Sequence, residues 1–208
     1  MNKPEPTVYI VDDDEAVRNS LVWLVSSVKL PAIAYGSADE LLDSLSPGTT
    51  GCILIDVRMP GISGLQLQEI LKERAPGLAV IIITAHADVP MAIRAMKAGA
   101  VDFIEKPFND QHVIELISKA MEKSADAYRK ADRTGEMREN FKTLTSRETQ
   151  VFERIITGRP NKVIAADLSL SEKTIEIHRA KAMRKMQAKS FAELVAMATR
   201  LQLDKETS

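Results

Sequence analysis

The chain has 208 residues, which is long for one compact domain and sufficient for two of ordinary size. Apolar residues make up 45% and charged residues 27%, a composition that excludes a disordered chain. The net charge of −1 is unevenly divided, because residues 1–123 carry 11 basic against 17 acidic side chains, whereas residues 124–208 carry 17 against 12. Only the second part is therefore expected to bind a polyanion.

The amino-terminal segment Met1–Pro6 has neither the basic nor the apolar region of a secretory signal. No apolar run reaches the roughly 18–20 residues that a membrane-spanning helix needs. The single cysteine, Cys52, cannot form an internal disulfide and lies in an apolar, strand-like segment, so we expect a buried, reduced thiol. These features together predict a cytoplasmic protein.

The first 120 residues alternate between short β-branched segments and longer segments with helical periodicity. The predicted strands are Thr7–Val11, Ala32–Tyr35, Gly51–Asp56, Ala79–Thr84 and Val101–Glu105. The predicted helices are Glu15–Val28, Ala38–Leu45, Gly64–Ala75, Pro90–Ala98 and Asp110–Lys123. Nearly continuous apolar strands, such as Val80–Ile83, indicate burial on both faces. This half is therefore predicted to be an α/β domain with a doubly wound, five-stranded parallel sheet that binds ligands at the carboxyl ends of its strands.

The remainder of the chain shows no strand signal. Residues 124–142 are charged and helix-favouring, with Gly135 as the only breaker, and are predicted to be a linker that extends the preceding helix at least to Arg133. The following pattern predicts the helices Ser146–Thr157, Asn161–Leu168, Ser171–Met186 and Ser190–Leu201. The expected organisation is thus a first domain over 1–123, a helical linker over 124–142 and an all-α domain over 143–208.

Charged and polar residues stand at the carboxyl ends of four predicted strands: Asp12, Asp13, Asp14, Asp56, Thr84 and Lys106. In a doubly wound sheet these ends converge on one crevice. Clustered carboxylates repel one another unless a cation neutralises them, and Mg²⁺ with oxygen ligands suits such a site. A lysine and a hydroxyl beside it would hold the oxygens of a phosphoryl group on Asp56. The run Asp12–Asp14 alone would more simply cap the next helix, but coincidence does not explain the whole set.

Four short motifs contain these residues: Asp12-Asp13, Asp56 with Met59-Pro60-Gly61, Thr84-Ala85, and Lys106-Pro107-Phe108. Together they resemble the motif set of the receiver domains of two-component response regulators, over roughly residues 6–123. The resemblance implies that Asp56 accepts a phosphoryl group from a histidine kinase. It also implies that Asp13, Asp56 and the Arg58 carbonyl bind Mg²⁺ directly, and that Asp12 acts mainly through water. Lys106 would pair with a phosphoryl oxygen, and the Thr84 hydroxyl would be drawn toward it.

The resemblance further implies a switch, in which movement of Thr84 lets Phe103 turn inward. Phe103 could equally be a core residue at the sheet edge, and the residues leave both roles open. The family's responding surface corresponds to Val89–Lys119. Three apolar residues there could pack in the core or form a dimer seam: Val89, Ile93 and Met96.

Two helices of the second half, Asn161–Leu168 and Ser171–Met186, have the lengths of a helix-turn-helix unit. At 3.6 residues per turn, the inward face of the second helix gathers Ile175, His178, Ala182, Met183 and Met186. Its opposite side carries Lys173, Thr174, Glu176, Ile177, Ala180, Lys181, Arg184 and Lys185. Small and polar residues near a helix N-terminus can reach base edges, and later basic residues can contact phosphates. A basic face by itself is as often simply solvated.

Three motifs resolve this ambiguity: Leu144-Thr145-x-Arg147-Glu148, Asn161-Lys162-x-Ile164-Ala165 and Ser171-x-x-Thr174-Ile175-x-x-His178. They resemble the LuxR/FixJ-type DNA-binding domain over residues 143–203. The DNA contacts expected from this resemblance and from the outward face are Asn161, Lys162, Lys173, Thr174, Glu176, Ile177, Ala180, Lys181 and Arg184. Glu176 departs from relatives that carry lysine there, so the DNA sequence stays open. The last helix resembles the family's dimerising helix, or it packs in the core.

The two resemblances together predict a FixJ-type response regulator, in which phosphorylation of Asp56 promotes dimerisation and permits DNA binding. Its expected partners are a sensor histidine kinase, promoter DNA, RNA polymerase and a second copy of the chain, with no membrane and no enzymatic role. One alternative is a haloacid-dehalogenase-type phosphatase with Asp12 as nucleophile, but its acidic pair near the fourth strand is absent and the helix-turn-helix is left unexplained. Another is a regulator that binds DNA without phosphate, which the complete pocket disfavours.

Overall fold

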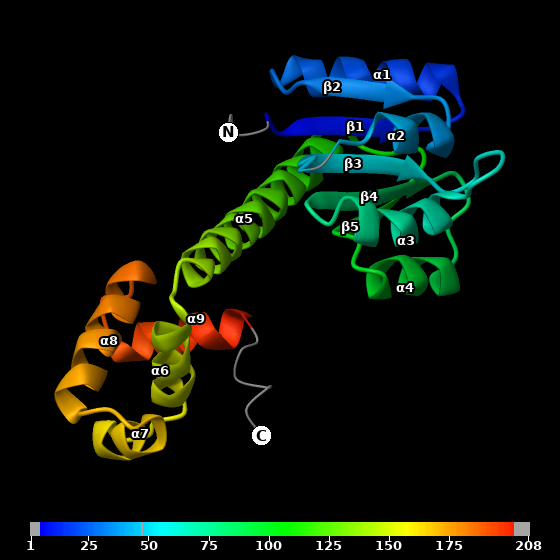
Figure 1. Ribbon diagram of the computed structural model, residues 1–208. Helices are drawn as coiled ribbons and strands as arrows, with labels where there is room; N and C mark the ends of the chain where they lie inside the picture. The colour runs from blue at the N-terminus through cyan, green and yellow to red at the C-terminus, as the bar shows by residue number, and fades with distance from the viewer. Residues whose placement is uncertain (1–4, 47, 202–208) are drawn as a thin grey trace. The chain divides into compact units, whose positions relative to one another are not determined.

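The computed structural model describes residues 5–46 and 48–201, and the chain divides into two compact units, Met1–Arg129 and Lys130–Ser208 (Figure 1). Residues 1–4 and 202–208, at the outer limits of the two predicted domains, lie outside the described residues, as does residue 47. The first unit has a hydrophobic core on each face of a sheet, and the second has a core of its own.

A five-stranded sheet in the order β2-β1-β3-β4-β5, with every pair parallel, forms the centre of the first unit. The strands are β1 (Thr7–Val11), β2 (Ala32–Tyr35), β3 (Gly51–Asp56), β4 (Leu78–Thr84) and β5 (Asp102–Glu105). The register pairs Asp56 with Ile83 and Thr84 with Glu105, so the carboxyl ends of β3, β4 and β5 lie side by side. The predicted doubly wound parallel sheet is confirmed.

Helices cover both faces of this sheet (Figure 1). One face is covered by α1 (Glu15–Ser27) and α5 (Asp110–Lys142), and the other by α2 (Ala38–Ser44), α3 (Gly64–Arg74) and α4 (Val89–Lys97). Alternate side chains of the central strands supply the two cores, with Leu54 and Ile81 on the α1 side and Ile53 and Ile82 on the α3 side. Burial on both faces explains why β3 and β4 consist of nearly continuous apolar residues.

The long helix α5 spans 33 residues and includes the segment expected to be a helical linker. It continues through Gly135, because one glycine in a helix interior costs only about 1 kcal/mol relative to alanine. In the first unit, the hydroxyl of buried Ser124 donates to the Gly77 carbonyl at 2.6 Å and accepts from the Gly51 amide at 2.8 Å. These two bonds fasten α5 to the amino ends of β3 and β4.

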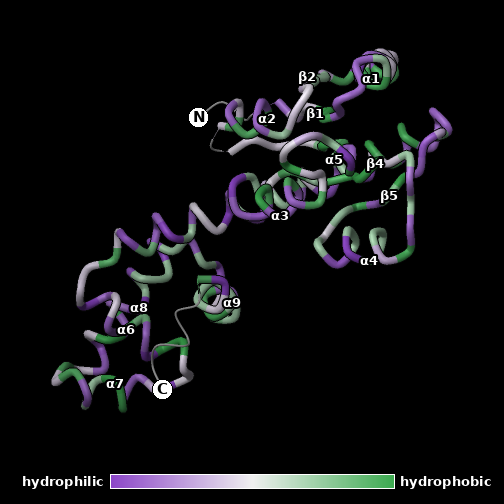
Figure 2. The backbone as a smooth tube through the Cα atoms, turned by 90° about the vertical axis from the view of Figure 1, so that its right-hand side faces the viewer, coloured by the Kyte–Doolittle hydropathy of each residue, from purple (hydrophilic) through white to green (hydrophobic). Residues whose placement is uncertain are grey.

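The second unit is all-α and consists of the end of α5 followed by α6 (Ser146–Ile156), α7 (Asn161–Leu168), α8 (Glu172–Lys185) and α9 (Phe191–Leu201). Its core is centred on the fully buried Phe152, which meets Phe141 of α5 edge-to-face at a centroid distance of 5.3 Å. Figure 2 shows α9 mostly in the green of apolar residues and α8 largely in purple. Among the described helices, none is long and apolar enough to cross a membrane.

Candidate functional site

An acidic pocket lies at the carboxyl ends of β1, β3, β4 and β5, where the sequence places its charged strand-end residues. The pocket is lined by Asp12, Asp13, Asp14, Asp56, Arg58, Thr84, Ala85, His86 and Lys106. The topology accounts for this convergence, because parallel strands end at the same edge of the sheet. The side chains predicted to form the phosphoacceptor site therefore line one pocket, although they are spread over 95 positions of sequence.

Lys106 joins two buried carboxylates at the centre of this pocket. Its Nζ donates to Asp12 Oδ2 at 2.6 Å and to Asp56 Oδ1 at 2.7 Å. The side chains of Asp12 and Asp56 are only 3% and 8% exposed, so both ion pairs are shielded from solvent. When all three side chains are ionised, two carboxylates and one ammonium give this cluster a net charge of one negative unit.

Burial and the hydrogen bonds of Lys106 shift two pKa values in the pocket. Burial raises the pKa of Asp12, and the hydrogen bonds from Lys106 and from the Asp14 amide only partly oppose this rise. Burial alone would lower the pKa of Lys106, but its hydrogen bonds to Asp12 and Asp56 outweigh that effect and raise it. Both shifts favour the protonated form: burial does so for Asp12, and the two neighbouring carboxylates do so for Lys106.

Asp56 is held by both of its carboxylate oxygens. Oδ2 accepts from the Arg58 amide at 2.6 Å, while Oδ1 accepts from Lys106. The loop after β3 folds closely over the backbone of Asp56, and a Cβ at Gly64 would stand 2.1 Å from the Asp56 carbonyl oxygen. Glycine is thus required at the start of α3. The sequence pattern did not predict this requirement, although the position of Gly64 after a turn could have suggested it.

Asp13, Asp14 and Thr84 occupy different positions around this centre. Asp14 is the N-cap of α1 and accepts from the amides of Ala16 and Val17, so the capping role considered for the acidic run belongs to this residue. Asp13 lines the pocket and is exposed. Thr84 is buried, and its hydroxyl accepts from the His86 amide at 3.3 Å. The cap explains Asp14, but it leaves Asp12 and Asp13 free for the pocket.

The donor set of the pocket fits a hard divalent cation. Across residues 5–46 and 48–201, no three His, Cys, Asp or Glu side chains are grouped as a ready-made metal cluster. Mg²⁺ does not require one, because it commonly keeps several waters and binds through one or two carboxylates. Asp12 and Asp56 supply buried carboxylate oxygens, Asp13 supplies an exposed one, and their excess negative charge is what a cation would neutralise.

The residues expected to respond to the pocket lie on α4 and β5. Val89, Ile93 and Met96 are 71%, 49% and 45% exposed, so the possibility that they pack in the core is wrong. Ala95 is the buried residue of α4 instead. Phe103 is partly buried and packs against the core on the α3 side, a position compatible with both roles considered for it.

The outward face of α8 is a second candidate site, in the all-α unit. Ile175, Ala182 and Met186 are buried, as the helical periodicity predicts. The exposed residues of the opposite face are Lys173, Glu176, Ile177, Ala180, Lys181 and Arg184, with Thr174 half-buried beside the Ser171 cap. On α7, Lys162 is exposed and Asn161 is half-buried. The structure thus presents the predicted DNA contacts on two consecutive helices.

Lys185 does not belong to this outward face, contrary to the helical projection from the sequence. Its Nζ donates to Glu148 Oε2 at 2.6 Å and to the Thr143 carbonyl at 2.8 Å. Glu148 is buried, and hydrogen bonds from Lys185 and from the Thr145 amide hold its pKa at about 2. The pattern Thr145-x-x-Glu148 signals the capping box that the structure contains, but no local pattern signals Lys185 as a partner.

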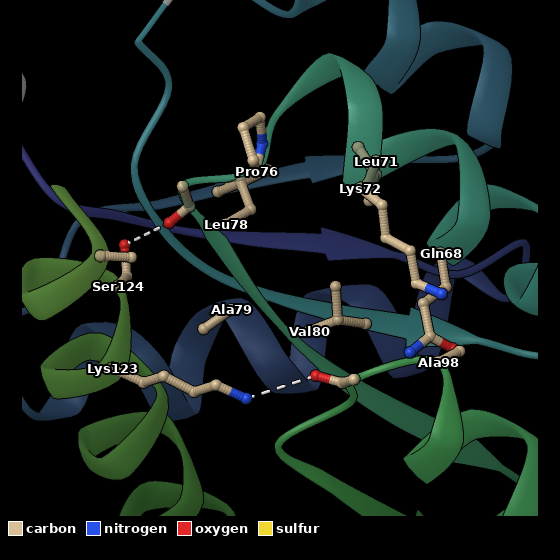
Figure 3. Close-up of a pocket in the computed structure, with 13 residues that line it drawn as sticks. Gln68, Leu71, Lys72, Pro76, Leu78, Ala79, Val80, Ala98, Lys123 and Ser124 are labelled. Atoms are coloured by element: carbon tan, nitrogen blue, oxygen red, sulfur yellow. Dashed lines mark hydrogen bonds between the residues drawn. The ribbon is translucent and has the colours of Figure 1, made fainter. Parts of the chain in front are cut away.

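A cavity at the opposite end of the sheet is separate from the acidic pocket (Figure 3). It lies beside the amino-terminal end of β4, between α3, α4 and α5, and its apolar wall includes Leu71, Leu78 and Val80. Lys123 reaches the Gly99 carbonyl at its edge, at 3.3 Å. Because no carboxylate lines it, this cavity takes no part in the site described above.

Comparison with known proteins assigns both units. Residues 8–118 match the family described as response regulator receiver domain, and residues 142–198 match the bacterial regulatory proteins of the luxR family. The transcriptional regulatory protein FixJ of Azorhizobium caulinodans is 46% identical over 92% of this chain and 90% of its own. Nodulation protein W of Bradyrhizobium diazoefficiens is 44% identical over 93% of this chain and 86% of its own.

Solved structures resemble the chain over nearly its full length. The response regulator StyR superposes with a TM-score of 0.81 at 38% identity, covering 95% of this chain and all of that one. Full-length FixJ from B. japonicum gives a TM-score of 0.57 at 39% identity, covering 96% of this chain and 98% of that one. Both likenesses extend over the sheet unit and the all-α unit together.

Proposed function

We infer the function of this chain from its family: it belongs to the response regulators, in which a receiver domain is joined to a luxR-type DNA-binding domain. It is accordingly a transcriptional regulator of a two-component system. The proposed domain limits are 1–123 for the receiver and 143–208 for the DNA-binding domain, with 124–142 as the helical connection. The finer assignment of roles to residues is our proposal.

Asp56 is proposed as the phosphoacceptor. The observation that carries this proposal is the position of its carboxylate, buried at the end of β3, with one oxygen on Lys106 and the other on the Arg58 amide. An Asp56 oxygen attacks the phosphorus of a phosphohistidine, forming an acyl phosphate while the P–N bond breaks and the imidazole leaves. Lys106 then pairs with an oxygen of the transferred group, and Thr84 turns its hydroxyl toward it.

Receiver domains typically bind Mg²⁺, and the donor set described above supports a magnesium site in this one. Asp13, Asp56 and the Arg58 carbonyl would hold the ion directly, with Asp12 acting through water. When bound, the ion supplies positive charge that stabilises the transferred phosphoryl group. Asp12 and Asp56 already share Lys106, and the remaining negative charge of the pocket gives the cation its binding energy.

Phosphorylation is proposed to act through a shift between two states. It adds about −1.5 to −2 charges at the end of β3. Only contacts that differ between the states can move the equilibrium, and Thr84 and Phe103 are the residues proposed to supply them. The exposed apolar residues of α4, Val89 and Ile93 among them, fit a surface that becomes a dimer contact.

DNA recognition is proposed for α8, supported by α7. Lys173, Thr174, Glu176 and Ile177 lie in the first turns of α8, from which side chains reach base edges in a major groove. Lys181 and Arg184 follow on the same exposed face, where they fit phosphate contacts. The proposed partners are thus double-stranded promoter DNA, a cognate sensor histidine kinase, RNA polymerase and a second copy of the chain, in the cytoplasm.

Labelling with acetyl phosphate tests the proposal. The wild-type protein in Mg²⁺ should gain one phosphoryl group on Asp56, measured by intact mass and peptide mapping, and Asp56→Ala should gain none there. Affinity for a DNA duplex selected by the protein should rise on labelling. A label on another residue would overturn the assignment of Asp56, and equal affinities before and after labelling would overturn the switch.

The phosphatase alternative loses support at the end of β4. Thr84 is followed by Ala85 and His86, and the next carboxylate, Asp88, accepts from the Met91 amide as the N-cap of α4. Because the Asp88 carboxylate caps α4, it does not supply the metal-binding pair that such a phosphatase needs. Rapid turnover of small phosphoesters by the wild-type protein would nevertheless restore that alternative.

A further inference from the structure

Lys185 stands at the last position of α8 and contacts two other segments of the second unit. One contact is to the buried carboxylate of Glu148 in α6, and the other is to the carbonyl of Thr143, one residue beyond the end of α5. The Lys185 side chain is 30% exposed and that of Glu148 is 5% exposed, so the pair is shielded on the Glu148 side. One ammonium group thus connects α5, α6 and α8.

The segment that Lys185 contacts is itself anchored in the core. Met137 and Phe141 of α5 pack against the hydrophobic cluster of this unit, and Phe141 lies edge-to-face on Phe152 of α6. Glu148 is also fixed, because its Oε2 accepts from the Thr145 amide at 2.8 Å within the capping box of α6. Lys185 therefore has two rigid partners, which is what a fixed position of the helix end requires.

We infer that Lys185 is a positioning residue for DNA recognition, which sets the place of α8 by tying its carboxyl end to Glu148 and to the end of α5. The inference rests on the proposed function, because it assumes that the outward face of α8 binds DNA. Lys185 has its hydrogen bonds directed into the protein, unlike Lys181 and Arg184, which are exposed. A small rotation at the end of α8 would displace both of those residues from the phosphates.

Glu148 provides the most direct way to separate positioning from simple charge attraction. Glu148→Gln removes a negative charge from the DNA-binding unit, so electrostatics alone predicts tighter binding to DNA. A positioning role predicts the reverse, because the amide no longer holds Lys185 as an ion pair. The matched control is Glu139→Gln, which removes the same charge from an exposed pair with Lys142 on α5.

Lys185→Met is the complementary variant, and Lys189→Met is its control, since it removes the same charge from an exposed position just after α8. Lys185→Arg keeps both a charge and the donors needed for Glu148 and Thr143. All variants are made in the full-length protein and labelled with acetyl phosphate. Their affinities for a duplex selected from a random library by the labelled wild-type protein are measured by fluorescence anisotropy at several salt concentrations.

We expect Glu148→Gln and Lys185→Met each to weaken binding about tenfold, the scale of one mismatched base pair. Both should leave the slope of affinity against salt unchanged, because neither residue contacts a phosphate. The two controls should stay within about twofold of the wild type, and Lys185→Arg should restore most of the affinity. The variant that combines Glu148→Gln with Lys185→Met should bind DNA no more weakly than Lys185→Met alone, because the two residues act through one bond.

Two results would overturn the inference. Glu148→Gln binding as tightly as Glu139→Gln would show that the pair has no positioning role, and a slope lowered by about one in Lys185→Met would make it a direct phosphate contact. If Glu148→Gln does not fold, as judged by circular dichroism, Lys185→Met and Lys185→Arg carry the test. Failure of the proposed function looks different, because Lys181→Met would then leave affinity unchanged, or the wild-type protein would select no sequence.

Discussion

Replacement of Gly64 by alanine should damage the phosphoacceptor site from outside it. The new Cβ would stand 2.1 Å from the Asp56 carbonyl oxygen and 2.9 Å from Ile55 Cγ2, and neither atom belongs to a flexible side-chain end. For the new Cβ to reach an ordinary van der Waals distance from the Asp56 carbonyl oxygen, the backbone of Asp56 or of α3 must move by about 1 Å or more. The Gly64 amide, which donates to the Val57 carbonyl at 3.0 Å, would move with it.

The expected cost follows from this overlap. Overpacking of a well-packed region typically lowers the free energy of unfolding by about 1–3 kcal/mol. We expect Gly64→Ala at the upper end of that range, because the substitution would also strain the hydrogen bond from the Gly64 amide to Val57. The displaced Asp56 carboxylate should also lose its alignment with the Arg58 amide and Lys106, so labelling by acetyl phosphate should slow about tenfold or more. The receiver would thus lose both stability and reactivity through one methyl group.

Gly36 supplies a matched control in the same unit. Its Cβ would meet only ordinary contacts, at 3.7 Å from Glu40 and 3.8 Å from Arg18. Gly36→Ala should therefore leave stability unchanged or raise it by up to about 1 kcal/mol. Urea unfolding followed by circular dichroism and the labelling rate measure both variants. A Gly64→Ala protein with the stability and labelling rate of Gly36→Ala would refute the reasoning.

Three other outcomes concern the cation, the pH and the core. Chelation of divalent cations should abolish labelling of Asp56 by acetyl phosphate and added Mg²⁺ should restore it; labelling that persists in chelator contradicts the proposed magnesium site. Because the folded-state pKa of Glu148 is lowered from 4.5 to about 2, its contribution to stability is present above pH 4.5 and is lost as the pH falls through about 2. Calorimetry should show that loss of stability in the wild type and a weaker dependence of stability on pH in Glu148→Gln. Equal pH dependences in the two proteins would contradict the lowered pKa of Glu148. Phe152→Ala should cost about 3–5 kcal/mol in the unfolding of the second unit, and an unchanged melting transition would contradict its central place in the core.

Secondary structure and topology could be predicted from local patterns. Every predicted strand and helix is present with ends within one residue of those expected, apart from α5, whose predicted extension continues to Lys142. Continuous apolar runs specify strands buried on both faces, and a helix cap such as Ser171 specifies where a helix begins. These signals are carried by residues a few positions apart, so they can be read without a tertiary structure.

The acidic pocket was also predictable, because the rule that parallel strands end at one edge turns sequence positions into neighbours. That rule places Asp12, Asp56 and Lys106 together, but it does not reveal that Lys106 bridges the two carboxylates while Thr84 accepts from His86. Nor does it assign Asp14 to a cap. Rotamers and hydrogen bonds within a pocket depend on packing from every side, which no single segment encodes.

The amino-acid order by itself determined the α/β and all-α units, the strand-end pocket and the basic outward face of α8. Only the tertiary structure decided that Val89, Ile93 and Met96 are exposed, that Gly64 must lack a side chain, and that Lys185 turns to Glu148, 37 positions earlier. Helical periodicity states which side of a helix a residue occupies. It does not state which neighbouring element lies at the border of that side, and the long-range packing of α5, α6 and α8 supplies that partner.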